Sequence, residues 1–234
     1  MEKKLALASF RTVAQLLLIG FVLQKVFEIS TLLALVPVIL LMLLTAAHTA
    51  AGRPSKSYRG MGPLAFCVMG VTSLAVTITA TGLIIGVEPW HRPGYLIPLL
   101  GMVLGNTMNG ISLSTDHFLE SLSERRQEVE MELAMGASRW EAARRPVAEA
   151  VRRGMIPIIN SMMVVGVVSL PGMMTGQILA GTDPAVAVKY QIMIMFMIAA
   201  GASLGSMGMV LLSFRRLFNS RHQLLAERIT GRRN

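Results

Sequence analysis

Asp116, His117 and Glu120 bring carboxylate and imidazole groups together at the end of a long apolar stretch. Residues three or four positions apart share one face of a helix, and these groups bind divalent cations, so a shared cation site is one interpretation. A solvated, acidic helix start at the membrane surface explains the same residues without a metal. We prefer this second interpretation and keep the three residues as weak metal candidates.

Methionine provides a second type of metal-binding group, because its thioether is a soft ligand and the chain contains 18 of them. Methionines that could lie along a metal path include Met162, Met163, Met173, Met174, Met193, Met195 and Met197. Methionine more often fills irregular gaps between packed helices, and packing is therefore the preferred role. Met162 and Met163 remain weak metal candidates.

Uncharged polar residues within the apolar stretches fall on single helix faces. Ser73, Thr77 and Thr81 are spaced by four residues, and Asn106 and Asn109 by three. Lipid cannot satisfy their hydrogen bonds, so both faces are predicted to point into a bundle or a cavity. Hydrogen bonding between helices is the favoured role of the Ser/Thr line, whereas the asparagines fit the lining of a transport path equally well.

A helix break is predicted at Pro171 and Gly172, with a short apolar segment over residues 173–180 after it. Irregular backbone at membrane depth must face protein or water, and broken helices of this kind often line a transport path. The residues assigned to that path are Asn106, Asn109, Pro171, Gly172, Met173, Met174 and Gly176.

Motifs for enzyme chemistry are missing from the sequence. It contains no GxxxxGK[ST] phosphate-binding loop, no HExxH and no GxSxG, and its one cysteine, Cys67, is not part of a CxxC pair. We therefore expect a non-catalytic chain without a bound cofactor. Any ATP and Mg²⁺ that drive transport should bind to a separate subunit. A secondary carrier or channel for a small polar solute is an alternative, as is an intramembrane enzyme built on Asp116, His117 and Glu120.

The composition predicts how these residues are held. With 53% hydrophobic and 15% charged residues and a mean hydropathy of +0.58, the chain of 234 residues is too apolar for a soluble domain. We expect one domain over residues 1–234, an all-α polytopic membrane bundle. About 20 helical residues cross the hydrocarbon core. The six candidate spans are residues 5–27, 31–49, 61–87, 94–115, 155–174 and 184–214.

The basic residues predict the orientation of these spans. All lysines and arginines except Lys25, Arg92 and Lys189 fall on one side of the proposed membrane. The positive-inside rule then places both termini, the segment 116–153 and the tail 215–234 in the cytoplasm, so the chain is a multi-pass protein of the cell (inner) membrane. This topology explains the net charge of +9, and we expect anionic lipid as a partner. We do not expect a nucleic-acid partner, because no aromatic residues lie between the basic residues to stack on bases.

The longest polar segment contains a predicted helical hairpin over residues 130–143. Gly136 is expected to end its first helix in the left-handed conformation, and Ser138 with Glu141 forms a capping box that starts the second. An ordinary turn between helices has the same pattern, but here the turn projects from a membrane bundle. We interpret it as a docking element. Its residues are Glu130, Glu132, Leu133, Ala134, Gly136, Ala137, Ser138, Trp140 and Glu141.

The hairpin resembles the EAA loop of ABC-transporter permeases. Glu130, Ala134 and the run Gly136-Ala-Ser match Glu-x-x-x-Ala-x-Gly-Ala-Ser, although Met131 and Glu132 stand where two alanines are usual. The resemblance implies a coupling helix that seats in a cytoplasmic ABC ATPase.

Four further segments resemble the FetB/YbbM family of ABC permeases linked to metal export, whose plant relatives are associated with aluminium tolerance. They are Ser-Leu-Pro-Gly-Met-Met-Thr-Gly at 169–176, Ala-Gly-Thr-Asp-Pro at 180–184, Lys-Tyr-Gln-Ile-Met at 189–193 and Asn-Ser-Arg-His-Gln-Leu at 219–224. The resemblance implies a homodimeric permease that exports a metal such as iron with a separate ATPase. Members of that family typically have a further membrane helix before the stretch that corresponds to residues 2–27.

Overall fold

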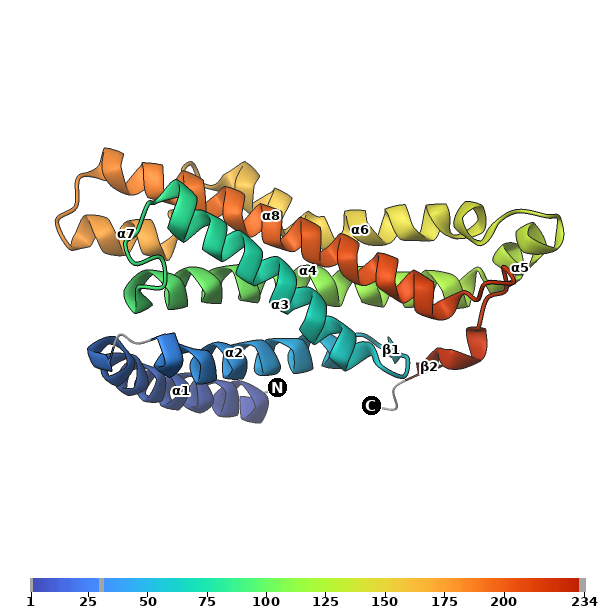
Figure 1. The fold of residues 1–234 in the computed structure, drawn as a ribbon, viewed down its shortest axis with the longest axis horizontal. Helices are drawn as coiled ribbons and strands as arrows, with labels where there is room; N and C mark the ends of the chain where they lie inside the picture. Colours follow the sequence, from blue (N-terminus) through green and yellow to red (C-terminus); the bar gives the residue numbers. More distant parts are fainter. Residues whose placement is uncertain (1, 30–31, 232–234) are drawn as a thin grey trace.

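The computed structural model describes residues 2–29 and 32–231 and shows an elongated bundle of helices (Figure 1). The predicted all-α class is confirmed, since the strands β1 (Lys56–Ser57) and β2 (Thr230–Gly231) form only a short antiparallel pair. The α-helices are α1 (Glu2–Ile29), α2 (Leu32–Gly52), α3 (Met61–Thr79), α4 (Pro93–Glu124), α5 (Arg126–Ala134), α6 (Arg139–Val164), α7 (Gly172–Leu179) and α8 (Pro184–Leu217). A π-helix, η1 (Ala80–Ile84), extends α3, and a 3-10 turn, η2 (Ala226–Arg228), precedes β2.

Among the described residues, five helices are long and apolar enough to cross a membrane. They are Leu5–Phe27, Leu35–Gly52, Met61–Ile84, Pro93–Glu124 and Pro184–Leu217. They correspond to five of the predicted spans, with α4 running on to Glu124 and the third span ending at Ile84 instead of residue 87. Residue 31, where the second span was predicted to begin, lies outside the described residues, as do Arg232 and Arg233 of the tail.

The predicted span over residues 155–174 is not helical up to the break expected at Pro171 and Gly172. Its first half is the end of α6, which begins far earlier at Arg139, and the chain leaves the helix at Val165. Gly166 takes a φ of 84°, and Pro171 then has the extended conformation from which α7 starts. The break therefore begins at Val165, six residues before Pro171, and ends at Pro171. The first half of α6 is charged and lowers the mean hydropathy of the helix. Apolar runs in the sequence therefore indicate only its second half.

Three helices, α4, α6 and α8, form the centre of the bundle and run side by side along its length (Figure 1). All three helices meet at Gly110, Gly154 and Ser206: a Cβ added at Gly154 would lie 2.7 Å from Ser206 Oγ and 2.8 Å from the Gly110 carbonyl oxygen. Lipid is as apolar as the side chains, so no hydrophobic force drives two helices together in a membrane. Small residues instead let the helix backbones approach closely and gain dispersion contacts. The contact fixes the relative positions of the three helices.

The predicted inward position of the Ser/Thr face of the third span is confirmed, but its predicted hydrogen bonding between helices is wrong, since neither Ser73 Oγ nor Thr77 Oγ1 has a partner among the described residues. Ser73 and Thr77 of α3 and Thr81 of η1 are fully buried, and Thr81 donates a hydrogen bond to the Thr77 carbonyl oxygen. Around them, α3 packs on α2, α4 and α8. Burial of these hydroxyls inside the bundle agrees with the rule that polar side chains avoid lipid.

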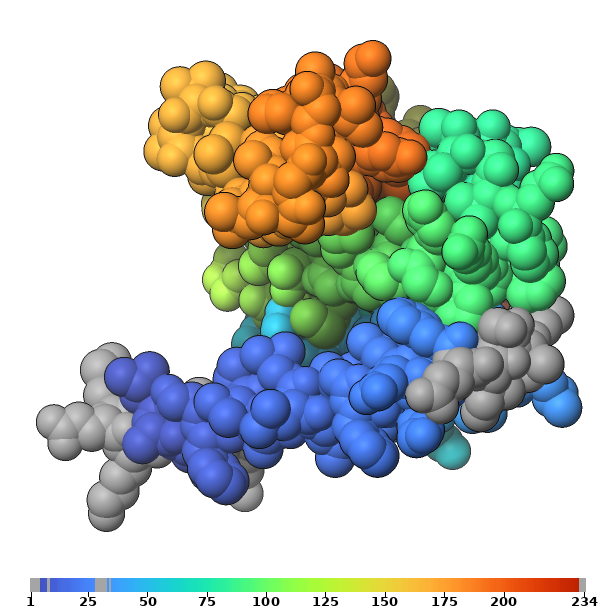
Figure 2. Space-filling view, turned by 90° about the vertical axis from the view of Figure 1, so that its left-hand side faces the viewer, coloured from blue at the N-terminus to red at the C-terminus, as the bar shows by residue number. Residues whose placement is uncertain are grey.

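The helices α1 and α2 form a ridge beside this centre. Figure 2 views the end of the molecule that carries α7, where the surface is hollowed between the ridge and the α6–α7 region and α4 lies recessed between them. Side chains of α1 such as Leu17 and Phe21 are largely exposed. An apolar helix this exposed needs lipid or another protein against it.

Candidate functional site

The hairpin lies at the opposite end of the bundle from α7, where α5 turns into α6 (Figure 1). Gly136 has a φ of 95°, as predicted. The amide of Ala137 donates to the Glu132 carbonyl oxygen at 3.0 Å and that of Gly136 donates to Leu133 at 3.2 Å. This pair of bonds is a Schellman motif, which ends α5 and satisfies two of its free carbonyl groups.

The start of α6 has the predicted capping box. The amide of Glu141 donates to Ser138 Oγ at 3.3 Å, and the amide of Ser138 donates to Glu141 Oε2 at 2.7 Å. Hydrogen bonds from Ser138 hold the pKa of the Glu141 carboxyl below its usual value, although the group is exposed. The turn between the two helices is therefore closed from both sides by local bonds.

Helix α5 is attached to the bundle by one face and exposes the other. Val129 is buried and Leu133 packs on the same core, while Met131 is 58% exposed and Met135 is 81% exposed. Trp140, at 45% exposure, completes an apolar tip in an otherwise charged segment. We call Met131, Met135 and Trp140 the apolar tip. Trp140 was assigned to the docking element from the sequence, but the two methionines were not, although their spacing of four residues places them on one helix face.

The C-terminal segment supports the hairpin from behind. Trp140 stacks edge-to-face on Phe214 with ring centroids 5.6 Å apart, and Phe214 packs on Phe218 at 5.1 Å. The amide of Arg139 donates to His222 Nδ1 at 2.8 Å, and the Arg139 guanidinium donates to the Asn219 carbonyl oxygen at 3.3 Å. Neither residue 219 nor residue 222 was assigned a role from the sequence, because the contact depends on how the tail folds back.

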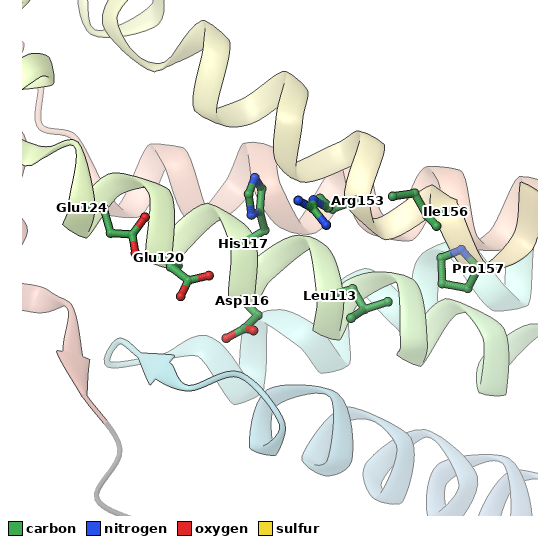
Figure 3. Close-up of a pocket in the computed structure, with 8 residues that line it drawn as sticks. All are labelled: Leu113, Asp116, His117, Glu120, Glu124, Arg153, Ile156 and Pro157. Carbon is green, nitrogen blue, oxygen red and sulfur yellow. The ribbon is translucent and has the colours of Figure 1, made fainter.

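A second candidate region is a polar groove between α4, α6 and the end of α2. Figure 3 shows its larger part, a cavity of about 520 Å³. Asp116 points toward the α2–β1 connection and His117 toward α6. The lining residues are Leu113, Asp116, His117, Glu120, Glu124, Arg153, Ile156 and Pro157. A neighbouring cavity of about 240 Å³ adds Arg53 and Asn109, with the Arg53 guanidinium donating to Asn109 Oδ1.

The structure does not bring the weak metal candidates together. Asp116 Oδ1 accepts hydrogen bonds from the amide and hydroxyl of Ser55, at 2.7 Å and 2.8 Å, whereas His117 Nε2 lies 4.0 Å from Glu149 Oε2. Within the described residues, no group of three or more His, Cys, Asp or Glu side chains could hold a metal ion. Met163 is exposed, and Met162 is half-buried and packs against the core.

Glu149 joins α6 to the end of α4. Its carboxylate accepts from Arg145 at 3.0 Å and lies 3.7 Å from Arg125 Nη2. The hydrogen bond from Arg145, helped by the charges of Arg125 and His117, holds the pKa of Glu149 below its usual value, against a smaller effect of burial. Pairs of Glu149 with His117 and Arg125 thus join α6 to the end of α4 beside the groove.

The residues assigned to the transport path occupy two separate places. Asn109 lines the polar groove, whereas Asn106 donates to the Met102 carbonyl oxygen at 2.9 Å and does not line it. Pro171 and Met174 line an apolar cavity of about 330 Å³ between the end of α6, α7 and α8. Gly172, Met173 and Gly176 belong to α7 but not to that lining.

Comparison with known proteins identifies relatives along nearly the whole chain. A family model described as "Uncharacterised protein family (UPF0014)" matches residues 1–218. A UPF0014 membrane protein of Synechocystis sp. is 38% identical over 218 residues, which is 93% of this chain and 84% of that protein. The Bacillus subtilis membrane protein YjkA is 34% identical over 95% of this chain and 88% of its own.

A third relative is the Escherichia coli protein named "Probable iron export permease protein FetB". It is 31% identical over 229 residues, covering 98% of this chain and 87% of that protein. No solved structure matches the chain. The resemblance to FetB predicted from the sequence is confirmed, and the chain belongs to the UPF0014 family of membrane proteins.

Proposed function

We propose that this chain is the membrane-spanning permease subunit of an ABC transporter that exports a metal ion such as iron from the cytoplasm. A separate cytoplasmic ATPase binds and hydrolyses ATP with Mg²⁺ and docks on the hairpin at 130–143. The carrying observation is the apolar tip of Met131, Met135 and Trp140, which is exposed at the end of a charged hairpin. Exposed apolar surface on a charged segment outside the candidate membrane spans favours a protein partner.

The geometry around the tip supports coupling as well as docking. The Schellman motif and the capping box make the turn rigid, and Trp140 contacts Phe214 at the end of α8. Movement of a docked partner would thus be passed to α6 and α8, the two helices packed against α4 at the bundle centre. Rigid elements with few internal degrees of freedom are the means by which such displacement is transmitted.

Two copies of the permease form the transport path in this proposal. The polar groove of Asn109, Asp116 and His117 is open on one side of a single chain, and α1 leaves apolar side chains uncovered. A symmetric pair would cover such surfaces and enclose a path, in keeping with the two-fold symmetry of most oligomers. The metal as cargo is suggested by the name of the E. coli relative.

The test is purification of the tagged chain in mild detergent together with the ATPase encoded beside it. We expect a complex of two permeases and two ATPases by native mass spectrometry, with ATPase activity that depends on the permease. Replacing Met131 and Met135 with glutamate should release the ATPase, while Ala148→Glu, which adds a charge at an exposed position further along α6, should leave the complex intact. A monomeric permease with no ATPase, or equal complex yield from both variants, would contradict the proposal.

A further inference from the structure

A cavity of about 830 Å³ lies where the start of α3, the end of α8 and the C-terminal segment meet. The β1–β2 pair closes one wall, since Lys56 pairs with Gly231 and Ser57 with Thr230. The lining residues are Ser57, Tyr58, Arg59, Gly60, Arg216, Glu227, Arg228 and Thr230. The start of α3 and the distant C-terminal part of the chain thus build one concave site, separate from both the hairpin tip and the polar groove.

The lining of this cavity is strongly basic. Arg59, Arg216 and Arg228 each come from a different segment, and all three side chains are exposed. Within residues 2–29 and 32–231, none of the three forms an ion pair with a carboxylate within 4.0 Å, and Glu227 is the acidic residue on the lining. One Nη of Arg228 donates to the Arg216 carbonyl oxygen at 3.0 Å, which holds two of the guanidinium-bearing segments together. Three arginines that line one cavity without ion-pair partners favour the binding of an anion in that cavity.

The chemistry of the lining suits a phosphate. A guanidinium is planar and donates in a fork that matches two phosphate oxygens, and such charge-assisted bonds are among the strongest hydrogen bonds in proteins. The hydroxyl of Ser57 lies on the same wall and can donate to a further oxygen, whereas that of Thr230 donates to the Ser57 carbonyl oxygen at 3.1 Å. A volume of about 830 Å³ exceeds what an inorganic ion fills and leaves room for a glycerophosphate headgroup.

The position of the cavity indicates where the phosphate comes from. Met61 begins the apolar helix α3, and Leu217 ends the apolar helix α8. The cavity therefore lies beside the ends of two helices that are long and apolar enough to cross a membrane, and such ends lie near lipid headgroups. Arginines at this level attract anionic lipids of the same leaflet.

We propose that this cavity binds the phosphate headgroup of an anionic phospholipid. The phosphate joins Arg59 at the start of α3 to Arg216 and Arg228 and so holds the C-terminal segment against the membrane surface. The same segment contacts the start of α6 through Asn219 and His222. The amount of anionic lipid therefore changes how firmly the C-terminal segment holds the hairpin, although the lipid does not contact the hairpin itself. This inference stands independently of the proposed transport cargo and of the ATPase.

The experiment measures lipid binding to the full chain, purified in a neutral detergent, by native mass spectrometry. Phosphatidylglycerol is the anionic probe, phosphatidylcholine the zwitterionic probe and inorganic phosphate the soluble one. We expect one tightly bound phosphatidylglycerol and only weak binding of the other two. Each arginine near a lipid surface contributes roughly a fivefold change in affinity, so the variant Arg59→Gln/Arg216→Gln/Arg228→Gln should bind phosphatidylglycerol about a hundredfold more weakly.

A matched variant with the same net charge controls for general attraction. Arg144→Gln/Arg152→Gln/Arg221→Gln removes three exposed arginines of the same side that do not line the cavity, and it should keep wild-type affinity. Replacing the three cavity arginines with lysine should recover part of the binding, which shows that the site is still folded. Equal binding to wild type and to the cavity variant, or equal loss in the control variant, would overturn the proposal. Inorganic phosphate that binds as tightly as phosphatidylglycerol would overturn the assignment to a lipid.

Discussion

The backbone amide of Arg139, the first residue of α6, donates a hydrogen bond of 2.8 Å to Nδ1 of His222 in the C-terminal segment. Amides in the first turn of a helix have no partner within the helix, so His222 supplies a cap that the local sequence does not. We expect His222→Ala to free this amide at a cost of about 1 kcal/mol, which makes its hydrogen exchange roughly fivefold faster. Exchange mass spectrometry over residues 136–142 measures this.

Arg221→Ala is the matched control for that change, because residue 221 uses its backbone amide to bond Asn219 Oδ1 and has an exposed side chain. Exchange at the start of α6 should be unchanged in it. The same rate in wild type and His222→Ala would show that the bond to His222 does not support the hairpin.

Acid should weaken the junction between α4 and α6 through Glu149. Its folded-state pKa is held low by Arg145 and by the charges of Arg125 and His117. A carboxyl with a lowered folded pKa stabilises the folded state above its unfolded pKa, and that contribution disappears as the pH falls through the folded pKa. Glu149→Gln should therefore lower the Tm slightly at pH 7, and the difference from wild type should vanish in strong acid. A difference independent of pH would argue against a charge effect.

Close packing at Gly154 should make alanine costly there. A Cβ would lie 2.8 Å from the Gly110 carbonyl oxygen and 2.9 Å from Ser114 Cβ, so α4 and α6 would have to separate. We expect Gly154→Ala to destabilise the chain by about 1–3 kcal/mol. Gly105→Ala in α4 meets nothing within 4 Å and should be neutral or slightly stabilising, since alanine favours a helix. Thermal unfolding of both variants in the same detergent tests this, and equal Tm values would contradict it.

Coupling should depend on the shape of the turn at residues 136 and 137. Gly136 needs its positive φ but has open space around it, so Gly136→Val should add strain of roughly 1–3 kcal/mol without a clash, while Gly136→Asn should be tolerated. Ala137→Trp should block docking. Both Gly136→Val and Ala137→Trp should reduce permease-dependent ATP hydrolysis or complex yield without lowering the amount of permease in the membrane.

Substitutions in the polar groove distinguish a docking hairpin from an enzyme site built on His117 and Glu120. Replacing His117 and Glu120 with alanine should affect ATPase coupling much less than Ala137→Trp. ATPase activity and complex yield unchanged by Ala137→Trp but abolished by His117→Ala would exclude the hairpin as the coupling element.

Water should reach Asn109 but not the outer face of α2. Asn109 lines a cavity beside Arg53, whereas Leu41 is exposed on an apolar helix. In a Cys67→Ala background, which removes the single cysteine, Asn109→Cys should react with a charged thiol reagent and Leu41→Cys only with an apolar one. Reaction of Asn109→Cys only from the lipid phase would remove it from the transport path. Asn106→Cys should react more slowly than Asn109→Cys, because residue 106 does not line the cavity.

Local patterns allowed much of this structure to be predicted from the sequence. The left-handed Gly136 and the capping box of Ser138 and Glu141 depend on neighbouring residues alone, and both were found as expected. Asp183 likewise caps α8 through the amides of Ala185 and Val186, as the Asp-Pro pair predicts.

Features that depend on tertiary contact could not be predicted in this way. The span over 155–174 was misplaced because α6 combines a charged half with an apolar half, and only packing against α4 and α8 makes it one helix. Asp116 and His117 are adjacent in sequence, yet their partners lie on different elements, Ser55 and Glu149. The tail contacts of His222 join residues 83 positions apart, beyond the reach of any local pattern.

The contact of Gly110, Gly154 and Ser206 also has a genetic consequence. Every missense change in a glycine codon introduces a side chain, and at residue 154 even the smallest one meets backbone of a neighbouring helix. Selection at this codon should therefore act through the packing of three helices. Among homologous genes, glycine should persist at this position, whereas codons for the exposed tip should diverge more freely.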